Sequence, residues 1–256
     1  MKIHIVNPNK MCFAFMEKLF TLSAIDIGHE IVFRERADLI IWIQYGDTAY
    51  KAEHPEQLHA LMQVEDWLKR PDCIITEYKP SGFDATWGFD LLNPHESYLP
   101  LGYHPALKVN CQKTWKKQIG LLGGLTQRRK DWNAAAQNKF DRISGWEYEE
   151  ALRKCAECKA NVHIHSYQPT QFTPWDRFAR LLHAGIFFVS EHCYCPMKSM
   201  EMFPSEVFGY DSDMDYWLSR SAAKLDDMAA DMQSEYIRDF DMRKLLEQKL
   251  KEVGNV

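Results

Sequence analysis

The sequence lacks any hydrophobic run long enough to cross a membrane. Its longest apolar stretches, such as residues 37–43, are far shorter than the ~20 residues that a transmembrane helix requires. No apolar signal segment follows Met1, and the seven cysteines do not indicate a disulfide framework. We therefore expect a reduced chain in the cytoplasm, or in the host cytoplasm if the protein is viral, with no membrane partner.

The sequence also lacks a strong excess of charge of either sign. Its 31 basic and 36 acidic residues give a formal charge of −5, so the composition carries no general signature of polyanion binding. A local basic patch at Lys113, Lys116 and Lys117 remains available for a nucleic-acid backbone. The length of 256 residues suffices for one large or two small domains.

Strand-like and helix-like patterns alternate along the chain, which predicts an α/β fold with mainly parallel sheets. The first half predicts strands over 2–8, 30–35, 38–46 and 72–78, and helices over 13–26 and 54–69. Prolines and a glycine interrupt the pattern at residues 97–107, and the rhythm restarts at 118–124. We therefore expect domains over 1–104 and 105–234, followed by a charged helical tail over 235–256.

The second half predicts a similar alternation. Helices are expected near 131–140, 147–158 and 174–184, strands over 161–166, 185–190 and 206–212, and helix from 213 onward.

A glycine-arginine loop follows the first strand of the second half. Gly123 and Gly124 allow the backbone to approach a diphosphate closely, while Arg128 and Arg129 can neutralise it through charge-assisted hydrogen bonds. Neither a metal ion nor a cofactor is then required. The alternative is a turn followed by a solvated basic run.

A second arginine-bearing unit spans residues 174–191, where a helix runs through a glycine into a short apolar strand. The N-terminus of such a helix, with Arg177, favours an anionic ligand. The alternative is an amphipathic helix with Phe178 buried and both Arg177 and Arg180 exposed.

The polar segment 163–173 follows a predicted strand, where open α/β sheets bind ligands. Its hydroxyl, amide and imidazole groups are candidates for lining a ligand site, and an ordinary polar loop is the alternative. The candidates are Gln168, Thr170 and Thr173, with either His165 or Tyr167 near the base of a nucleotide ligand.

These features, in order, resemble the GT-B glycosyltransferases. The resemblance rests on MKIHIVN, ITEY, YLPLGYHP, LLGGLTQRR, RFARLLHAGIFFVSE and FPSEVFGYDSDMDYWL. Within that group it is nearest to phage DNA β-glucosyltransferases and spore-protein-like glycosyltransferases. It implies two Rossmann-like domains facing across a cleft, a C-terminal helix crossing back to the first domain, and a nucleotide-diphosphate sugar, such as a UDP-sugar, as donor. The acceptor it suggests is a hydroxymethylated pyrimidine in double-stranded phage DNA. We expect a monomer.

The resemblance also implies roles for the arginines. The glycine-arginine loop holds the donor phosphates in the family. The family helix carries an arginine followed three residues later by a glutamate; Arg177 matches the arginine, but Arg180 occupies the glutamate position. This reversal removes the acceptor for a ribose diol. A different donor, a contact from elsewhere such as Glu191, or an alignment offset would each account for it.

An inverting transfer needs a general base at the rim of the cleft, whereas a retaining reaction does not need one of this kind. Glu77 ends the predicted strand 72–78 and follows Thr76, as an aspartate follows a threonine in the phage enzymes. Asp47 and Asp84 occupy competing loops. Acidic residues at strand ends also serve simply as solvated groups or helix caps.

Two other function classes stay open. A catalytically inert nucleotide- or sugar-binding module would keep the cleft and lose the base. A zinc-dependent nucleic-acid-binding protein would use Cys155, Cys158, His163, His165 and the HCYC segment at 192–195. That spacing is unfamiliar for zinc, and it places the cysteines on a helix and the histidines on a strand. We therefore expect no metal site.

Overall fold

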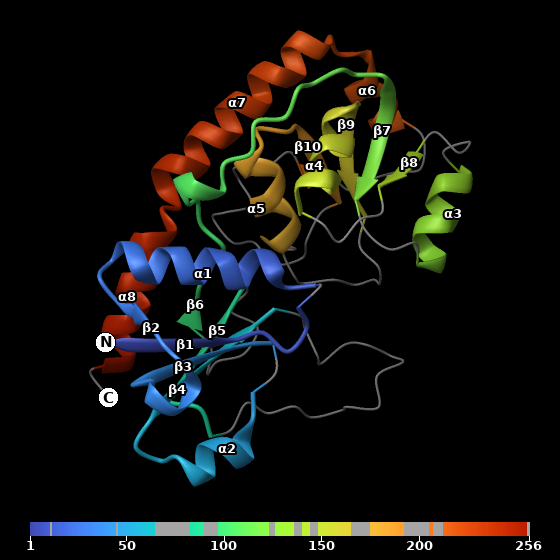
Figure 1. Ribbon diagram of the computed structural model, residues 1–256. Coiled ribbons are helices and arrows are strands. Elements are labelled where there is room, and N and C mark those ends of the chain that lie inside the picture. Colours follow the sequence, from blue (N-terminus) through green and yellow to red (C-terminus); the bar gives the residue numbers. More distant parts are fainter. Residues whose placement is uncertain are drawn as a thin grey trace. The chain divides into compact units, whose positions relative to one another are not determined.

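The computed structural model describes residues 1–10, 12–44, 46–64, 82–89, 97–122, 126–135, 140–143, 148–164, 175–191, 205–206 and 212–254. The chain divides into two compact units. Unit 1 comprises Met1–Ala106, Phe172–Asp176 and Phe240–Val256, and unit 2 comprises Leu107–Gln171 and Arg177–Asp239. Each unit is built around a parallel sheet (Figure 1).

Unit 1 contains a six-stranded parallel sheet in the order β2-β1-β3-β4-β5-β6. Its strands are β1 (Lys2–Val6), β2 (Glu30–Ile31), β3 (Leu39–Ile43), β4 (Leu58–Gln63), β5 (Ala85–Gly88) and β6 (Ser97–Tyr98). Its helices are α1 (Ala14–Asp26), α2 (Thr48–Glu53) and α8 (Met242–Gly254), with short 3-10 turns at Arg34–Arg36 and Pro105–Leu107.

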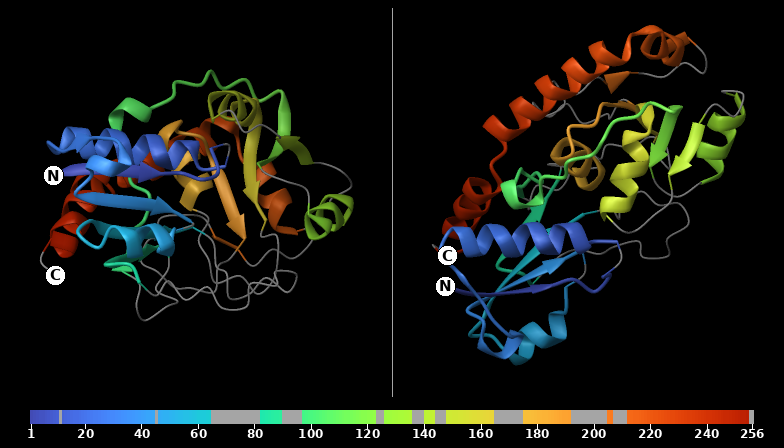
Figure 2. Two further views of the ribbon diagram at one scale, coloured as in Figure 1. Left: turned by 60° about the horizontal axis from the view of Figure 1, so that its bottom comes forward. Right: turned by 45° about the horizontal axis from the view of Figure 1, so that its top comes forward.

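The core of unit 1 lies around β3, whose five residues are all buried because strands flank it on both sides. Helix α1 turns Met16, Leu19 and Phe20 inward and ends before Gly28, which takes a positive φ of 84°. Helix α8 packs against α1, and α2 lies on the opposite face of the sheet from α1 (Figures 1 and 2).

The prediction of a helix over 54–69 is wrong, because residues 58–63 form β4. Two of the polar side chains that suggested a solvated helix, Gln57 and His59, are buried and hydrogen-bonded instead. The Nε1 of Trp42 donates to the Nδ1 of His59 at 3.1 Å, and the backbone N–H of His59 donates to Asp84 at 2.7 Å. A buried polar side chain with a hydrogen-bond partner interrupts the run of apolar residues by which a buried strand is recognised in the sequence. The predicted strand 72–78 lies outside the described residues.

Unit 2 repeats the same architecture with a five-stranded parallel sheet in the order β11-β10-β9-β7-β8. Its strands are β7 (Lys117–Leu122), β8 (Phe140–Ile143), β9 (Cys158–His163), β10 (Phe188–Glu191) and β11 (Ser205–Glu206). Its helices are α3 (Gln127–Ala135), α4 (Tyr148–Ala156), α5 (Trp175–His183), α6 (Ser212–Ser219) and α7 (Ala222–Asp239), although the first two residues of α5 belong to unit 1.

Boundaries in unit 2 differ from the predictions by a few residues. Helix α3 begins at Gln127 rather than 131, and Phe140, predicted to end that helix, begins strand β8. Strand β8 lies at the sheet edge, where half of its residues are polar and the alternation gives little signal. The tail also divides differently: residues 235–239 end α7 in unit 2, and α8 in unit 1 begins at Met242.

Within unit 1, the segment leading out of the sheet lies along the start of α8. Tyr103 pairs with Asp241 in an isolated parallel bridge, and the N–H of Met242 donates to the Tyr103 carbonyl at 3.0 Å. The chains are so close that a Cβ on Gly102 would lie 2.3 Å from the Phe240 carbonyl oxygen. A glycine is therefore required at position 102.

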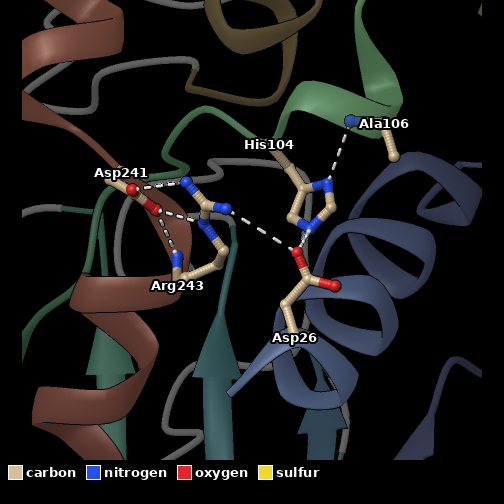
Figure 3. A network of polar contacts seen from close by, with 5 residues as sticks. All are labelled: Asp26, His104, Ala106, Asp241 and Arg243. Atoms are coloured by element: carbon tan, nitrogen blue, oxygen red, sulfur yellow. Dashed lines mark hydrogen bonds and ion pairs between the residues drawn. The ribbon is translucent and has the colours of Figure 1, made fainter.

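A polar network holds the same segment to α1 (Figure 3). The buried His104 ring accepts a hydrogen bond at Nδ1 from the Ala106 N–H at 3.2 Å, so its Nε2 donates to Asp26 at 3.1 Å. Arg243 pairs with Asp241 at 2.7 Å and lies 3.8 Å from Asp26. Burial lowers the pKa of His104 against the opposing effect of the Asp26 carboxylate. The ring is therefore held neutral.

Candidate functional site

The candidate site lies at the carboxyl ends of the strands in unit 2, where the order of strands reverses. Strands β7 and β9 are neighbours in the sheet. From β7 the chain continues to β8 on one side, whereas from β9 it continues to β10 on the other side. Open α/β sheets bind ligands at such a switch point. The structure brings the start of α3, the ends of β9 and β10, and the first turn of α5 to this edge. We call Arg128, Arg129, His163, Arg177 and Glu191 the carboxyl-edge cluster.

Arg128, the second residue of α3, forms a two-pronged ion pair with Glu191, the last residue of β10. Its Nη1 donates to Glu191 Oε2 at 2.7 Å, and its Nη2 contacts Oε1. The Glu191 side chain is 6% exposed and that of Arg128 is 21% exposed. Such fork geometry fixes both side chains. The positive charge of Arg128 is thus partly balanced within the protein.

Arg129 has a different environment from its neighbour. It is 2% exposed, and its Nε donates to the carbonyl oxygen of Ile164 at 2.8 Å. This bond ties the first turn of α3 to the end of β9. Sequence reasoning assigned the same phosphate-binding role to Arg128 and Arg129, whereas the structure places Arg129 in the interior.

Arg177 lies in the first turn of α5 and contacts the side chain of His163, the last residue of β9. Arg177 Nη1 and His163 Nδ1 are 2.9 Å apart. A guanidinium group only donates hydrogen bonds, so Nδ1 is the acceptor and the imidazole is neutral in this contact. Phe178 meets the imidazole edge-on, with ring centroids 5.6 Å apart.

Arg180 is buried, with 9% of its surface exposed, on a helix whose Phe178, Leu181 and Leu182 are also buried. The alternative of an amphipathic helix that exposes both arginines is therefore wrong for Arg180.

Seven other predicted site residues lie outside the described residues. They are Glu77, Gly123, Gly124, His165, Gln168, Thr170 and Thr173.

The two competing carboxylates of unit 1 are described, and each has a structural contact. Asp47 Oδ1 accepts a hydrogen bond from the Tyr50 N–H at 2.9 Å and so caps α2. Asp84 accepts hydrogen bonds from Lys51 Nζ and the His59 N–H, both at 2.7 Å. Burial alone would raise the pKa of Asp84, but these donors hold it below its usual range.

The thiols that suggested zinc chemistry are Cys155 and Cys158. Burial raises the pKa of Cys155 strongly and that of Cys158 to about 11, which disfavours the thiolate form that binds metals. Within the described ranges, no three histidine, cysteine, aspartate or glutamate side chains gather as metal ligands. His165, Cys193 and Cys195 fall outside those ranges.

Acidic neighbours lie close to two of the three lysines of the patch in unit 2, Lys113 and Lys117. Lys113 pairs with Asp226 at 2.7 Å, and Lys117 lies 4.0 Å from Asp141 and 3.9 Å from Glu157. In the part of the chain that the structure describes, no helix is both long and apolar enough to span a bilayer.

Sequence reasoning identified the arginines of the cluster but not their partners. It considered His163 as a zinc ligand and Glu191 as a ribose contact. The available signal was positional, because both residues end apolar strands and the ends of adjacent parallel strands meet at one edge. The pairing of β9 with β10 then brings the two residues to the same place, because Ser190, the residue before Glu191, lies opposite His163.

No protein-family model matches the sequence, and no curated protein is significantly similar to it. Solved structures are similar along almost the whole chain. AviGT4, a glycosyltransferase involved in avilamycin A biosynthesis, has 11% identity and a TM-score of 0.57, with 99% of this chain and 97% of AviGT4 covered. Anabaena Alr3699/HepE, solved with UDP and glucose, has 9% identity and a TM-score of 0.51, with 100% and 99% covered. The chain therefore has a mixed α/β fold with parallel sheets, of the GT-B type.

Proposed function

We propose that the protein is a glycosyltransferase that binds a nucleotide-diphosphate sugar at the carboxyl-edge cluster and transfers the sugar to an acceptor hydroxyl. The observation that carries this proposal is the convergence of Arg128 and Arg177 at the switch point of unit 2 in a chain with the GT-B fold. UDP is the first nucleotide to test, because HepE was solved with UDP and glucose.

The two arginines supply the charge that a diphosphate leaving group needs. Arg177 is positively charged at every accessible pH, its contact with His163 is to a neutral imidazole, and it lies in the first turn of a helix, where anions are favoured. Arg128 is held in place by Glu191. Negative charge developing on the diphosphate as the sugar–oxygen bond breaks would be stabilised by these groups without a metal ion or cofactor.

For the acceptor side we propose an inverting reaction with Glu77 as the general base and Asp47 as its competitor. The base takes the proton of the acceptor hydroxyl while that oxygen attacks the anomeric carbon and the diphosphate departs. The role of Glu77 as the base is supported by its position near the end of the segment 72–78, which the sequence predicts to be a strand. Asp47 is supported by its position after β3, at the carboxyl end of the unit 1 sheet.

The acceptor proposed from the sequence resemblance is a hydroxymethylated pyrimidine in DNA, acted on by a monomeric enzyme. The order of motifs supports it, whereas the acids paired with Lys113 and Lys117 reduce the basic footprint available to DNA. A donor screen with and without hydroxymethylated DNA tests this acceptor, and light scattering tests the monomer. Transfer to small hydroxylated acceptors alone would contradict the DNA proposal and leave the donor site intact.

Calorimetric titration with UDP tests the donor site. Replacing Arg128 or Arg177 with alanine is expected to weaken UDP binding by about 1.5–3 kcal/mol per lost charge-assisted contact. Arg128→Ala should also lower the free energy of unfolding, because it removes the ion-pair partner of the buried Glu191 carboxylate. Arg153→Ala is the matched control, because Arg153 is exposed and pairs only locally with Glu149 on α4. UDP affinity equal to wild type in both cluster variants would contradict the site. Binding of nucleotide sugars without transfer or hydrolysis would instead indicate the inert module.

A further inference from the structure

The two arginines of the cluster have partners of opposite protonation behaviour. Arg128 faces the carboxylate of Glu191, whereas Arg177 faces the imidazole of His163. The guanidinium of Arg177 is protonated at every accessible pH and has no acceptor atom. The 2.9 Å contact therefore requires a lone pair on His163 Nδ1, which places the imidazole proton on Nε2.

The His163 ring is held in a fixed position. It is 5% exposed, and its backbone is paired with Ser190 of β10. Phe178 packs against the ring edge-on and itself stacks on Phe188, with centroids 4.7 Å apart. A fixed acceptor of this kind restricts the rotamers of the long Arg177 side chain before a ligand arrives. Ligand binding then costs less side-chain conformational entropy.

We propose that His163 is a positioning residue that aims Arg177 at the diphosphate of the donor, and that it does so only while its imidazole is neutral. This inference rests on the proposed function, since it concerns the same donor site. It makes nucleoside-diphosphate binding weaken at acidic pH, when the imidazole takes up a proton.

The charges around His163 favour its neutral form. Arg177 faces it from α5, Arg129 of α3 binds the next carbonyl along the chain, and the Arg128–Glu191 pair lies at the same edge. A proton on Nδ1 removes the acceptor and places a second cation against Arg177. Both effects disfavour the Arg177–His163 contact, so affinity for a diphosphate falls as pH falls.

Two variants separate positioning from mere packing. Asparagine at position 163 offers an amide oxygen near the place of Nδ1 and cannot be protonated, whereas leucine offers no acceptor. His163→Leu should weaken UDP binding about 10-fold while leaving uridine binding unchanged, because only UDP carries the diphosphate. His163→Asn should retain UDP affinity within about 3-fold at pH 8. It should keep only the pH dependence that protonation of the terminal phosphate of UDP gives to every variant. His54→Asn, at a half-exposed histidine of unit 1, should keep the wild-type pH profile.

The tautomer is measured independently in the ligand-free protein by ¹⁵N NMR of the imidazole. A neutral ring protonated at Nε2 is expected, and a ring protonated at Nδ1 overturns the proposal. Wild-type UDP affinity in His163→Leu, or affinity that rises toward low pH, also overturns it, the latter because it would make the imidazolium a direct phosphate ligand. If wild type binds no nucleoside diphosphate, the proposed function fails; an Nε2 tautomer lost in Arg177→Ala would still support the contact itself. If His163→Leu does not fold, His163→Asn and the NMR measurement decide.

Discussion

The Arg128–Glu191 pair offers the sharpest test of the charge arrangement at the carboxyl edge. Replacing Glu191 with glutamine keeps the size of the side chain and one acceptor oxygen but removes its negative charge. The carboxylate is buried and accepts both prongs of the Arg128 fork, so the change leaves a guanidinium with a weaker partner. Removing the charge should lower the free energy of unfolding by about 1–3 kcal/mol.

The same change should strengthen UDP binding. Two unit charges about 6 Å apart interact by roughly 3 kcal/mol at an effective dielectric constant of ~20, so a carboxylate at this edge opposes an incoming diphosphate. Because Arg128 already offsets part of that repulsion, we expect a gain of about 1–2 kcal/mol, or roughly 5- to 30-fold in affinity.

Calorimetric titration of the variant with UDP and with uridine decides between two roles. Tighter UDP binding with unchanged uridine binding supports a charge-balancing role for Glu191. Weaker binding of both ligands would refute this reasoning and make Glu191 the acceptor for the ribose hydroxyls, and unchanged affinity would refute both roles. Glu149→Gln is the matched control, because Glu149 is an exposed carboxylate of the same unit.

Three further predictions concern the base and the fold. If Glu77 is the base, Glu77→Gln should lower sugar transfer by at least ~10²-fold with UDP affinity unchanged; a loss in Asp47→Asn instead, a change that keeps the cap of α2, would assign the role to Asp47. Gly102→Ala should lower the free energy of unfolding by about 2–4 kcal/mol in denaturant titration, because its Cβ would meet a carbonyl oxygen at 2.3 Å. Gly254→Ala, with open space around the new Cβ, should be nearly neutral, and equal losses in both would contradict the close approach. Since burial lowers the pKa of His104 in the folded state, the unfolded chain binds more protons below about pH 6.5, and stability should fall as pH drops through that window. His104→Gln should flatten this dependence in thermal unfolding, and an unchanged pH profile would contradict it.

The sequence predicts the fold class correctly because alternating strands and helices leave a periodic record in the residues. The sequence-based prediction fails at β4. His59 is buried there and accepts a hydrogen bond from Trp42, whereas its polar side chain suggested a surface residue. The candidate site is likewise predicted only in part. Charge and a preceding apolar strand identify Arg128 and Arg177, but their partners come from other strands, and no local pattern encodes which strands are neighbours.

The close packing of α8 on α1 has a consequence for how the protein is made. Residues 240–254 belong to unit 1 but are synthesised after all of unit 2. Domains usually fold in the order in which they emerge from the ribosome. Here the sheet of unit 1 emerges first, yet the buried Leu246 and Leu250 of α8 arrive last. The nascent amino-terminal half must therefore keep the α1 surface beneath α8 uncovered until translation of this segment is complete.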